Sequence, residues 1–323
     1  MPSTLRPIAS RVLPVDRLSP LASTKATRAV LEKHGLATKK ALGQHFLIND
    51  GIVKRICTVA GLDEGDVVLE VGPGIGTLTV ALLQKAGFVI AVERDNDLVS
   101  VLADICAKHP GNFALISKDA LTLTEADLRA APRLPNKFVS NLPYAVAATL
   151  VLGFFERFPS LGSATVMVQS EVADRMCAKP GTKAYGAYTV KLSLFARLVE
   201  RFAVGPGNFF PPPRVESAVL RLDRCQPHDE AGNPLDDEAI QAACTMADAA
   251  FANRRKTILN SCKSYFEAQG EEESPIMKAL PHILEQAGID PRLRGETLET
   301  TAYIKLGQSL RLSTSEMSPP SKA

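Results

Sequence analysis

The chain has 323 residues, of which 46% are hydrophobic and 22% are charged. This length and composition are typical of a globular, soluble protein that is long enough for two domains. No apolar run reaches the ~18 residues of a membrane span, so we expect no segment embedded in a membrane. The net charge of +2 alone indicates no class of partner.

Charge is distributed unevenly along the chain. Residues 1–55 contain ten basic and three acidic residues, which leaves the remainder with a net charge of about −5. A basic front end on a mildly acidic body favours a localised contact with a polyanion. A solvated, flexible leader has the same composition, so this alternative stays open.

The first residues also bear on localisation. They lack a secretory pattern, but they are rich in Arg, Ser and Thr and poor in acids, which is also typical of an organelle transit peptide. Residues 23–35 instead predict an ordered helix that Ser23 or Thr24 caps and Gly35 ends. The six cysteines are scattered without a C-x-x-C pair, which fits a reducing compartment and indicates neither disulfides nor a zinc site. We therefore expect a cytoplasmic enzyme that uses no metal.

Strand-forming and helix-forming runs alternate from residue 67 to residue 169. Strands separated by helices predict an α/β fold, with a mostly parallel sheet and helices on both faces. Residues 194–204 and 217–223 are expected to complete the sheet as an antiparallel pair, although the first run also reads as a helix end followed by a strand. The expected strands cover 67–71, 88–93, 113–117, 137–141 and 164–169, and the expected helices cover 77–87, 97–108 and 148–158.

A polar segment with two prolines, residues 225–238, separates this part from a second one. Beyond it, apolar residues recur at helical spacing from Ile240 to Cys262, and shorter helices are expected at 276–287 and 296–310. The second domain should therefore be small and all-α. The expected division is a partly helical N-terminal extension 1–38, an α/β domain 39–224, a linker 225–238, a helical RNA-contacting domain 239–312 and a disordered tail 313–323.

Glycine and acidic residues follow three consecutive expected strands. A G-x-G-x-G loop (72–76) follows the first strand, where glycine lets the backbone approach a bound ligand closely. Glu93 ends the second strand, where an acid binds ribose hydroxyls, and Asp119 follows the third, where it could accept from an adenine amine. This pattern is typical of methyltransferases that depend on S-adenosylmethionine. NAD is the alternative ligand, because it needs the same acid at its ribose.

The fourth strand ends in Asn141-Leu142-Pro143-Tyr144, and in a doubly wound sheet this end faces the glycine loop. An exocyclic adenine amine is a poor nucleophile, because its lone pair is delocalised, and it needs two acceptors for its two hydrogens. Asn141 Oδ1 and the Leu142 carbonyl oxygen suit this role, by positioning rather than acid–base catalysis. Pro143 fixes the backbone, and Tyr144 offers a face for the flipped base, worth about 1–3 kcal/mol. A plain turn is the alternative.

The chain from about residue 39 to residue 310 resembles the ribosomal RNA small-subunit adenine dimethyltransferase family. The resemblance rests on these segments: KKALGQHFLIND (39–50), LEVGPGIGTLT (69–79), NLPYAVA (141–147), NFFPPPRVESAVLRL (208–222), AFANRRKTILNS (250–261) and GIDPRLRGETL (288–298). It implies a Rossmann-like class I methyltransferase that dimethylates N6 of two adjacent adenosines in the 3′-terminal hairpin loop of 16S rRNA. It further implies an immature small ribosomal subunit as substrate, late in biogenesis, and a monomeric enzyme.

The resemblance also assigns cofactor positions. One of them departs from the family, because His45 stands where many members have Asn. His45 can still donate a hydrogen bond, with a pH-sensitive charge, or it merely packs. The expected cofactor-binding residues are His45, Leu47, Gly72, Gly74, Gly76, Glu93, Asp119 and Asn141.

Aromatic and basic residues complete the expected RNA site. Phe209 or Phe210 is expected to stack on the target base opposite Tyr144, unless both pack in the core. A candidate RNA-phosphate patch follows in the helical part, where helical spacing makes one arginine structural and favours the two lysines as RNA contacts. Its residues are Arg254, Arg255, Lys256 and Lys263.

Three other functions stay open. A 23S rRNA adenine-N6 methyltransferase that confers antibiotic resistance shares the N-x-P-Y segment, although the C-terminal motifs argue against it. A mitochondrial transcription factor derived from the family needs a transit leader and often loses the pocket. A largely non-catalytic checkpoint factor for ribosome assembly would bind immature subunits, with methylation secondary.

Overall fold

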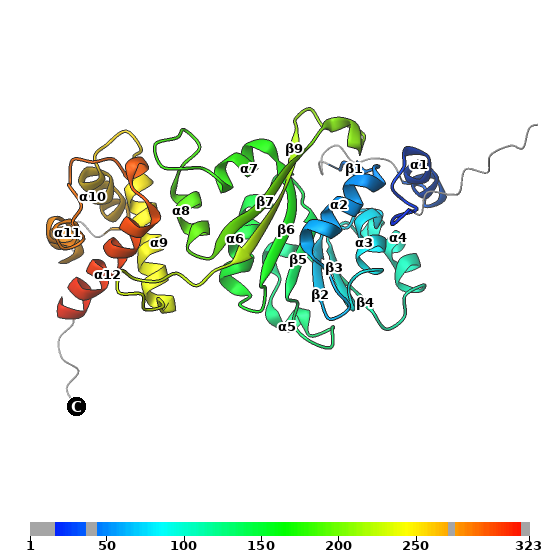
Figure 1. Cartoon of the computed structure of the whole chain (residues 1–323), viewed down its shortest axis with the longest axis horizontal. Helices are drawn as coiled ribbons and strands as arrows, with labels where there is room; N and C mark the ends of the chain where they lie inside the picture. Colours follow the sequence, from blue (N-terminus) through cyan, green and yellow to red (C-terminus); the bar gives the residue numbers. More distant parts are fainter. Residues whose placement is uncertain (1–16, 37–43, 271–274, 318–323) are drawn as a thin grey trace, which may run out of the picture.

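The structure, a computed structural model, describes residues 17–36, 44–270 and 275–317. Its centre is a seven-stranded sheet in the order β4-β3-β2-β5-β6-β9-β7 (Figure 1). The first five of these strands run parallel, and β9 and β7 are antiparallel, so the predicted strands and the antiparallel pair are confirmed. The strands are β2 (Val67–Val71), β3 (Phe88–Glu93), β4 (Phe113–Ser117), β5 (Lys137–Asn141), β6 (Ser163–Gln169), β7 (Ala196–Val204) and β9 (Ser217–Arg224).

Helices cover both faces of the sheet. Successive residues of a strand point to opposite sides, so each face presents apolar side chains that helices bury. Leu69 and Ile90 are buried in one cluster with Phe154 of α6. Their neighbours Val68 and Val89 are buried in a second cluster, which also holds residues of α2, α3 and α4. The helices of this part are α2 (Asp50–Ala60), α3 (Thr77–Leu82), α4 (Asn96–Cys106), α5 (Glu125–Leu128), α6 (Ala147–Arg157), α7 (Ser170–Met176) and α8 (Ala187–Ser193).

α3 ends at Leu82, although the sequence predicts a helix that continues to Gly87. The chain turns before β3, and the Gly87 N–H donates to the Asp66 carbonyl at 3.0 Å. A Cβ at position 87 would lie 2.1 Å from the Glu64 carbonyl oxygen. Gly87 therefore allows a close backbone crossing rather than ending the helix.

Two small elements lie at one end of the sheet (Figure 1). α1 (Thr24–Lys33) confirms the predicted N-terminal helix, and Ser23 Oγ accepts from the Ala26 N–H at 3.2 Å. Leu31 of α1 packs in one cluster with Leu98 and Phe46. Phe46 lies in β1 (Phe46–Leu47), which pairs antiparallel with β8 (Phe209–Phe210). The sequence does not predict this pair, because two-residue strands have no periodicity. Residues 1–16 of the expected extension lie outside the described residues.

The helical region forms the other end of the molecule (Figure 1). A turn splits the predicted helical run 240–262 into two helices, and the last helix includes residues 313–317, which the sequence assigns to a disordered tail. Residues 318–323 lie outside the described residues. No helix in the described ranges is long and apolar enough to cross a membrane. The helices are α9 (Asp237–Phe251), α10 (Ile258–Ala268), α11 (Pro275–Gln286) and α12 (Thr300–Met317).

The helical region is attached to the sheet by more than the linker. Tyr185, which precedes α8, is buried in the same cluster as Tyr303 of α12. Its hydroxyl donates to the Leu298 carbonyl at 2.7 Å. Arg254, in the turn between α9 and α10, donates to the Thr182 carbonyl at 2.9 Å. These contacts fix the helices relative to the sheet.

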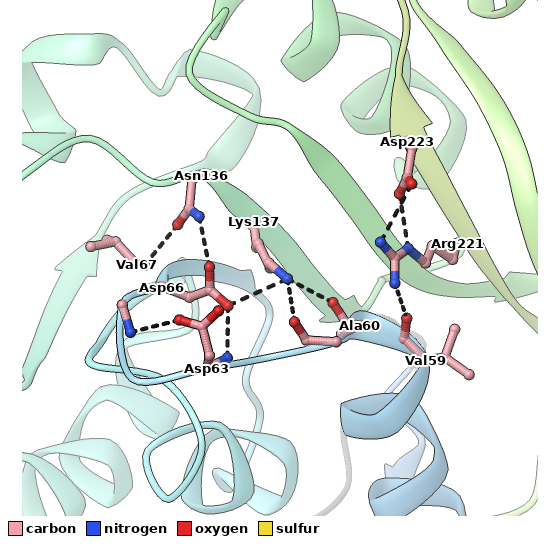
Figure 2. A network of polar contacts seen from close by, with 11 residues as sticks. Val59, Ala60, Asp63, Asp66, Val67, Asn136, Lys137, Arg221 and Asp223 are labelled. Carbon is pink, nitrogen blue, oxygen red and sulfur yellow. Dashed lines mark hydrogen bonds and ion pairs between the residues drawn. The ribbon is translucent and has the colours of Figure 1, made fainter.

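A polar network anchors the amino ends of β2 and β5 (Figure 2). Asn136 Nδ2 donates to Asp66 Oδ1 at 2.7 Å, and Asn136 Oδ1 accepts from the Val67 N–H at 2.8 Å. Lys137 Nζ lies 3.3 Å from Asp66 Oδ2 and donates to the Ala60 carbonyl at 2.9 Å. Ala60 ends α2, where a cation complements the helix dipole. The network sets β2 against β5 and ties α2 to both.

Substituting Lys137 by Met should lower the free energy of unfolding by about 3 kcal/mol, because the buried Asp66 carboxylate loses its cation. Urea unfolding measures this change. The double variant Lys137→Met/Asp66→Asn should recover part of the loss. Lys85→Met, at an exposed lysine, is the matched control and should change stability by less than about 0.5 kcal/mol. A Lys137→Met protein as stable as the wild type would contradict this role.

Candidate active site

A cavity of about 550 Å³ opens at the carboxyl ends of the parallel strands, at the opposite end of β2 and β5 from the network in Figure 2. Its size is within the range of small-molecule and cofactor sites. Segments far apart in the sequence meet there, from β1 and from the ends of β2, β3, β4 and β5. The predicted site residues that line it are His45, Leu47, Gly72, Gly74, Glu93, Asp119, Asn141, Leu142, Pro143 and Tyr144.

The cavity lies where β2 and β5 part. The last pair in their ladder is Leu69 with Phe138, and beyond it the fully buried Ser140 bridges the strands with its side chain. Ser140 Oγ donates to the Val71 carbonyl at 2.5 Å and accepts from the Val71 N–H at 3.2 Å. From β2, the sheet continues to β3 on one side and to β5 on the other. This is the switch point of a doubly wound sheet, where ligands bind.

The glycine loop contacts two other segments that line the cavity, the N-L-P-Y segment and β1. Gly72 and Gly74 have φ values of 66° and 62°, which favour glycine. A Cβ on Gly72 would lie 3.2 Å from the Pro143 ring, and one on Gly74 would lie 3.2 Å from the Phe46 ring. The loop therefore packs directly on the N-L-P-Y segment and on β1. Gly76 is not among the lining residues and lies at the start of α3.

Two carboxylates line the cavity at the ends of β3 and β4. Glu93 is 7% exposed, and its Oε1 accepts from the Arg94 and Asp95 N–H groups, each at 2.9 Å. Burial raises the pKa of the Glu93 carboxyl, and the backbone hydrogen bonds offset part of this rise. Asp119 is more exposed and lies 3.5 Å from the Arg94 guanidinium. Both can accept hydrogen bonds from hydroxyl or amino groups of a ligand.

The N-L-P-Y segment is held in place by side chains from other elements. Asn141 Nδ2 is 3.5 Å from the His45 carbonyl, and Asn141 Oδ1 has no donor among the described residues. The Tyr144 hydroxyl is 2.7 Å from Ser217 Oγ. Burial raises the pKa of this hydroxyl, and the bond to Ser217 offsets part of the rise. The Tyr144 ring stacks on the His45 ring at 5.9 Å, with 28° between the planes.

The His45 imidazole links the Tyr144 ring to the proline-rich loop, residues 211–213. His45 Nδ1 lies 2.7 Å from the Pro211 carbonyl oxygen. A carbonyl only accepts, so Nδ1 carries the hydrogen and donates it. The side chain thus contacts Pro211 and Tyr144 while it lines the cavity. Whether it also binds a cofactor stays a prediction.

Phe209 and Phe210 differ from their expected place opposite Tyr144. Phe209 is 2% exposed and packs in the same core cluster as Leu47, and the Phe210 ring lies 5.1 Å from the Arg28 guanidinium. Neither is among the lining residues. The pairing of β8 with β1 directs one ring into the core and the other toward α1, so the core-packing alternative fits Phe209.

The predicted RNA-contacting cations lie in the helical region, outside the cavity. Arg254 forms an ion pair with Glu296 at 2.7 Å, so it has a structural contact, but it is exposed and lies in the turn between α9 and α10 rather than on an apolar stripe of a helix. Arg255 and Lys256 are exposed, and Lys263 is partly buried. Within the described part of the chain, these three cations form no ion pair, so they stay candidates for contact with phosphate.

The sequence leaves seven polar lining residues without a role: Gln44, Glu70, Thr77, Arg94, Asp95, Lys118 and Gln169. Gln44 and Asp95 contact each other, with Gln44 Nε2 2.9 Å from Asp95 Oδ2. Glu70 is 1% exposed and opens the E-x-G-x-G-x-G pattern, which is the signal that points to it. Gln169 ends β6. Over the described residues, no group of three or more His, Cys, Asp or Glu could hold a metal ion.

Comparison with known proteins places this geometry in a family. The model of the ribosomal RNA adenine dimethylase family matches residues 35–305. The ribosomal RNA small subunit methyltransferase A of Nocardia farcinica is 40% identical over 283 residues, which cover 86% of this chain and 92% of that protein.

Two solved structures have a similar fold. A dimethyladenosine transferase from Plasmodium falciparum is 24% identical with a TM-score of 0.68, and the match covers 84% of this chain and 98% of that one. The 23S rRNA methyltransferase ErmE is 25% identical with a TM-score of 0.58, and the match covers 82% and 99%. The family match includes the glycine loop, the N-L-P-Y segment and the first three helices of the helical region. The chain belongs to the ribosomal RNA adenine dimethylase family.

Proposed function

We propose that this protein transfers methyl groups from S-adenosylmethionine to N6 of two adjacent adenosines, dimethylating both, in the 3′-terminal hairpin loop of 16S rRNA. Its substrate is the immature small ribosomal subunit, late in assembly, and it acts as a monomer in the cytoplasm. The contact between Gly72 and Pro143 carries the proposal, because it sets the cavity and the base-binding segment side by side. Family membership supports the class of reaction.

The lining residues fit S-adenosylmethionine. Glu93 is suited to the ribose hydroxyls and Asp119 to the adenine amine, and the positive φ values of Gly72 and Gly74 allow a ligand to approach the backbone. When bound, the cofactor supplies a methyl group on a positively charged sulfur. NAD also needs an acid at its ribose, but its usual loop has the spacing G-x-G-x-x-G rather than the G-x-G-x-G found here.

The target amine is positioned rather than deprotonated. Asn141 Oδ1 and the Leu142 carbonyl accept its two hydrogens, which turns the nitrogen lone pair toward the methyl group. Tyr144 stacks on the base, and its contacts with His45 and Ser217 keep the ring from turning. The methylated amine is acidic enough to lose its proton to water, so the site needs no general base.

Two observations support the small ribosomal subunit as the substrate. The relative from Nocardia farcinica is a small-subunit methyltransferase by name, and its similarity extends over most of both chains. The helical region, which carries the exposed Arg255 and Lys256, is joined to the α/β part through hydrogen bonds of Tyr185 and Arg254. Cations held in this way can align a folded RNA with the pocket through its phosphates.

Substituting Asn141 by Ala should reduce the methyl-transfer rate by about 10²–10³-fold, because the amine loses one of its two acceptors. Binding of S-adenosylmethionine should weaken no more than severalfold. Single-turnover kinetics and calorimetry measure the two quantities. Asn233→Ala, in the exposed turn at 229–233, is the matched control and should behave as the wild type. Unchanged turnover in Asn141→Ala would refute the positioning mechanism.

Substituting Glu93 by Ala should weaken S-adenosylmethionine binding at least about tenfold, because the ribose loses a buried charged acceptor. The change also frees the Arg94 and Asp95 N–H groups, so circular dichroism must first show that the variant is folded. Glu64→Ala, at an exposed acid outside the cavity, is the control. Equal affinity of Glu93→Ala and wild type by calorimetry would remove Glu93 from the site.

The substrate is tested by transfer of labelled methyl groups to small subunits that lack the modification. We expect about four methyls per immature subunit, mapped to two adjacent adenosines, and little label on naked 16S rRNA or mature subunits. Label on 23S rRNA instead would overturn the small-subunit assignment. No label on any RNA, with intact binding to subunits, would make the protein a binding factor.

A further inference from the structure

Glu70 is a buried acid that the proposed mechanism does not use. It lies in β2, is 1% exposed and lines the cavity. Its Oε2 atom is buried and has no hydrogen-bond partner in the described part of the chain. The same is true of the hydroxyl of Thr77, in α3. Glu70 and Thr77 both line the cavity, and two unpaired polar groups in its wall indicate that a polar ligand completes them.

The surroundings of Glu70 disfavour a negative charge. Burial raises the pKa of its carboxyl to about 8, the nearby Thr79 hydroxyl offsets part of this rise, and the charge of Glu93 adds to it. Cys57 faces it from α2, and burial raises the pKa of this thiol to about 12, so the thiol is neutral. No cation is among the groups that act on Glu70. In the ligand-free protein at neutral pH, Glu70 is therefore mostly protonated.

We propose that Glu70 gives up its proton when S-adenosylmethionine binds, so that the carboxylate pairs with the positive charge of the cofactor's methionine end. The inference rests on the proposed cofactor, which carries an ammonium and a sulfonium. The Glu70 proton passes to solvent, and no covalent bond of the cofactor changes. A cation in the cavity supplies the partner that the protein does not provide, which favours the ionised carboxyl.

Two consequences follow from linkage between protons and ligand. Below pH 8, the cofactor competes with a proton, so its affinity should rise by up to about tenfold per pH unit. Above pH 8, Glu70 is already ionised and this dependence should end. The number of protons released should be close to one at pH 6.5 and fall to about one tenth at pH 9.

Calorimetric titration of the full-length protein with S-adenosylmethionine tests this. At pH 6.5, in two buffers of different ionisation enthalpy, the wild type should release about one proton more per cofactor than Glu70→Gln. The ammonium of the cofactor is protonated at this pH, and any contribution from it appears equally in both proteins. Glu64→Gln, at an exposed acid, should match the wild type.

Equal proton release in wild type and Glu70→Gln would overturn the inference and leave the proposed cofactor intact. If S-adenosylmethionine produces no binding heat and does not shift the melting temperature, the proposed function fails first.

Thermal unfolding without ligand gives a second readout. The folded pKa of Glu70 lies above the ordinary value of 4.5, so its contribution to stability is complete below pH 4.5 and is lost as pH rises through 8. The melting temperature of Glu70→Gln should therefore rise relative to that of the wild type as the pH increases from 5.5 to 9. A difference that stays constant over this range would show that Glu70 does not titrate there, and the proposal would be wrong. If the variant does not fold, the fall in proton release by the wild type between pH 6.5 and pH 9 decides the question.

Discussion

The side-chain bridge between β2 and β5 is the constraint on which the site depends. Backbone pairing between these strands ends at Leu69 and Phe138, and the Ser140 hydroxyl then takes over both hydrogen bonds to Val71. The strands can therefore separate without leaving buried backbone groups unpaired, which would be costly. Because they separate here and nowhere earlier, the glycine loop and the N-L-P-Y segment leave the sheet side by side, with a cavity between them.

Small contacts between segments that are far apart in the sequence position the other residues that line the cavity. The short β1–β8 pair places His45 next to Tyr144 and the proline-rich loop, and α1 packs over this pair. At the far end of the sheet, Tyr185 and Arg254 join the helical region to the α/β part. Walls held by contacts from several elements suit the proposed reaction, in which the site positions an amine and adds no acid or base.

The sequence predicts the parallel core well, and the reasons are physical. Strands buried on both faces appear as apolar runs that end in glycine or acid, so the edge of the sheet that holds the cavity can be found from Gly72, Glu93 and Asp119. Pairing between distant short segments has no such pattern, which is why the sequence does not predict the β1–β8 pair and leaves the place of Phe209 open between the target base and the core. The burial of Glu70 could not be predicted either, because it depends on how α3 and α2 close over β2.

The most direct test of the central claim is a crystal structure of the protein with S-adenosylhomocysteine, the cofactor without its methyl group. We predict that the ribose lies on Glu93, the adenine lies beside Asp119, and the sulfur faces Asn141 Oδ1 across the gap next to Pro143. Binding of the ligand elsewhere, or with its sulfur turned away from Asn141, would contradict the claim that the separation of β2 and β5 joins cofactor and target base in one site.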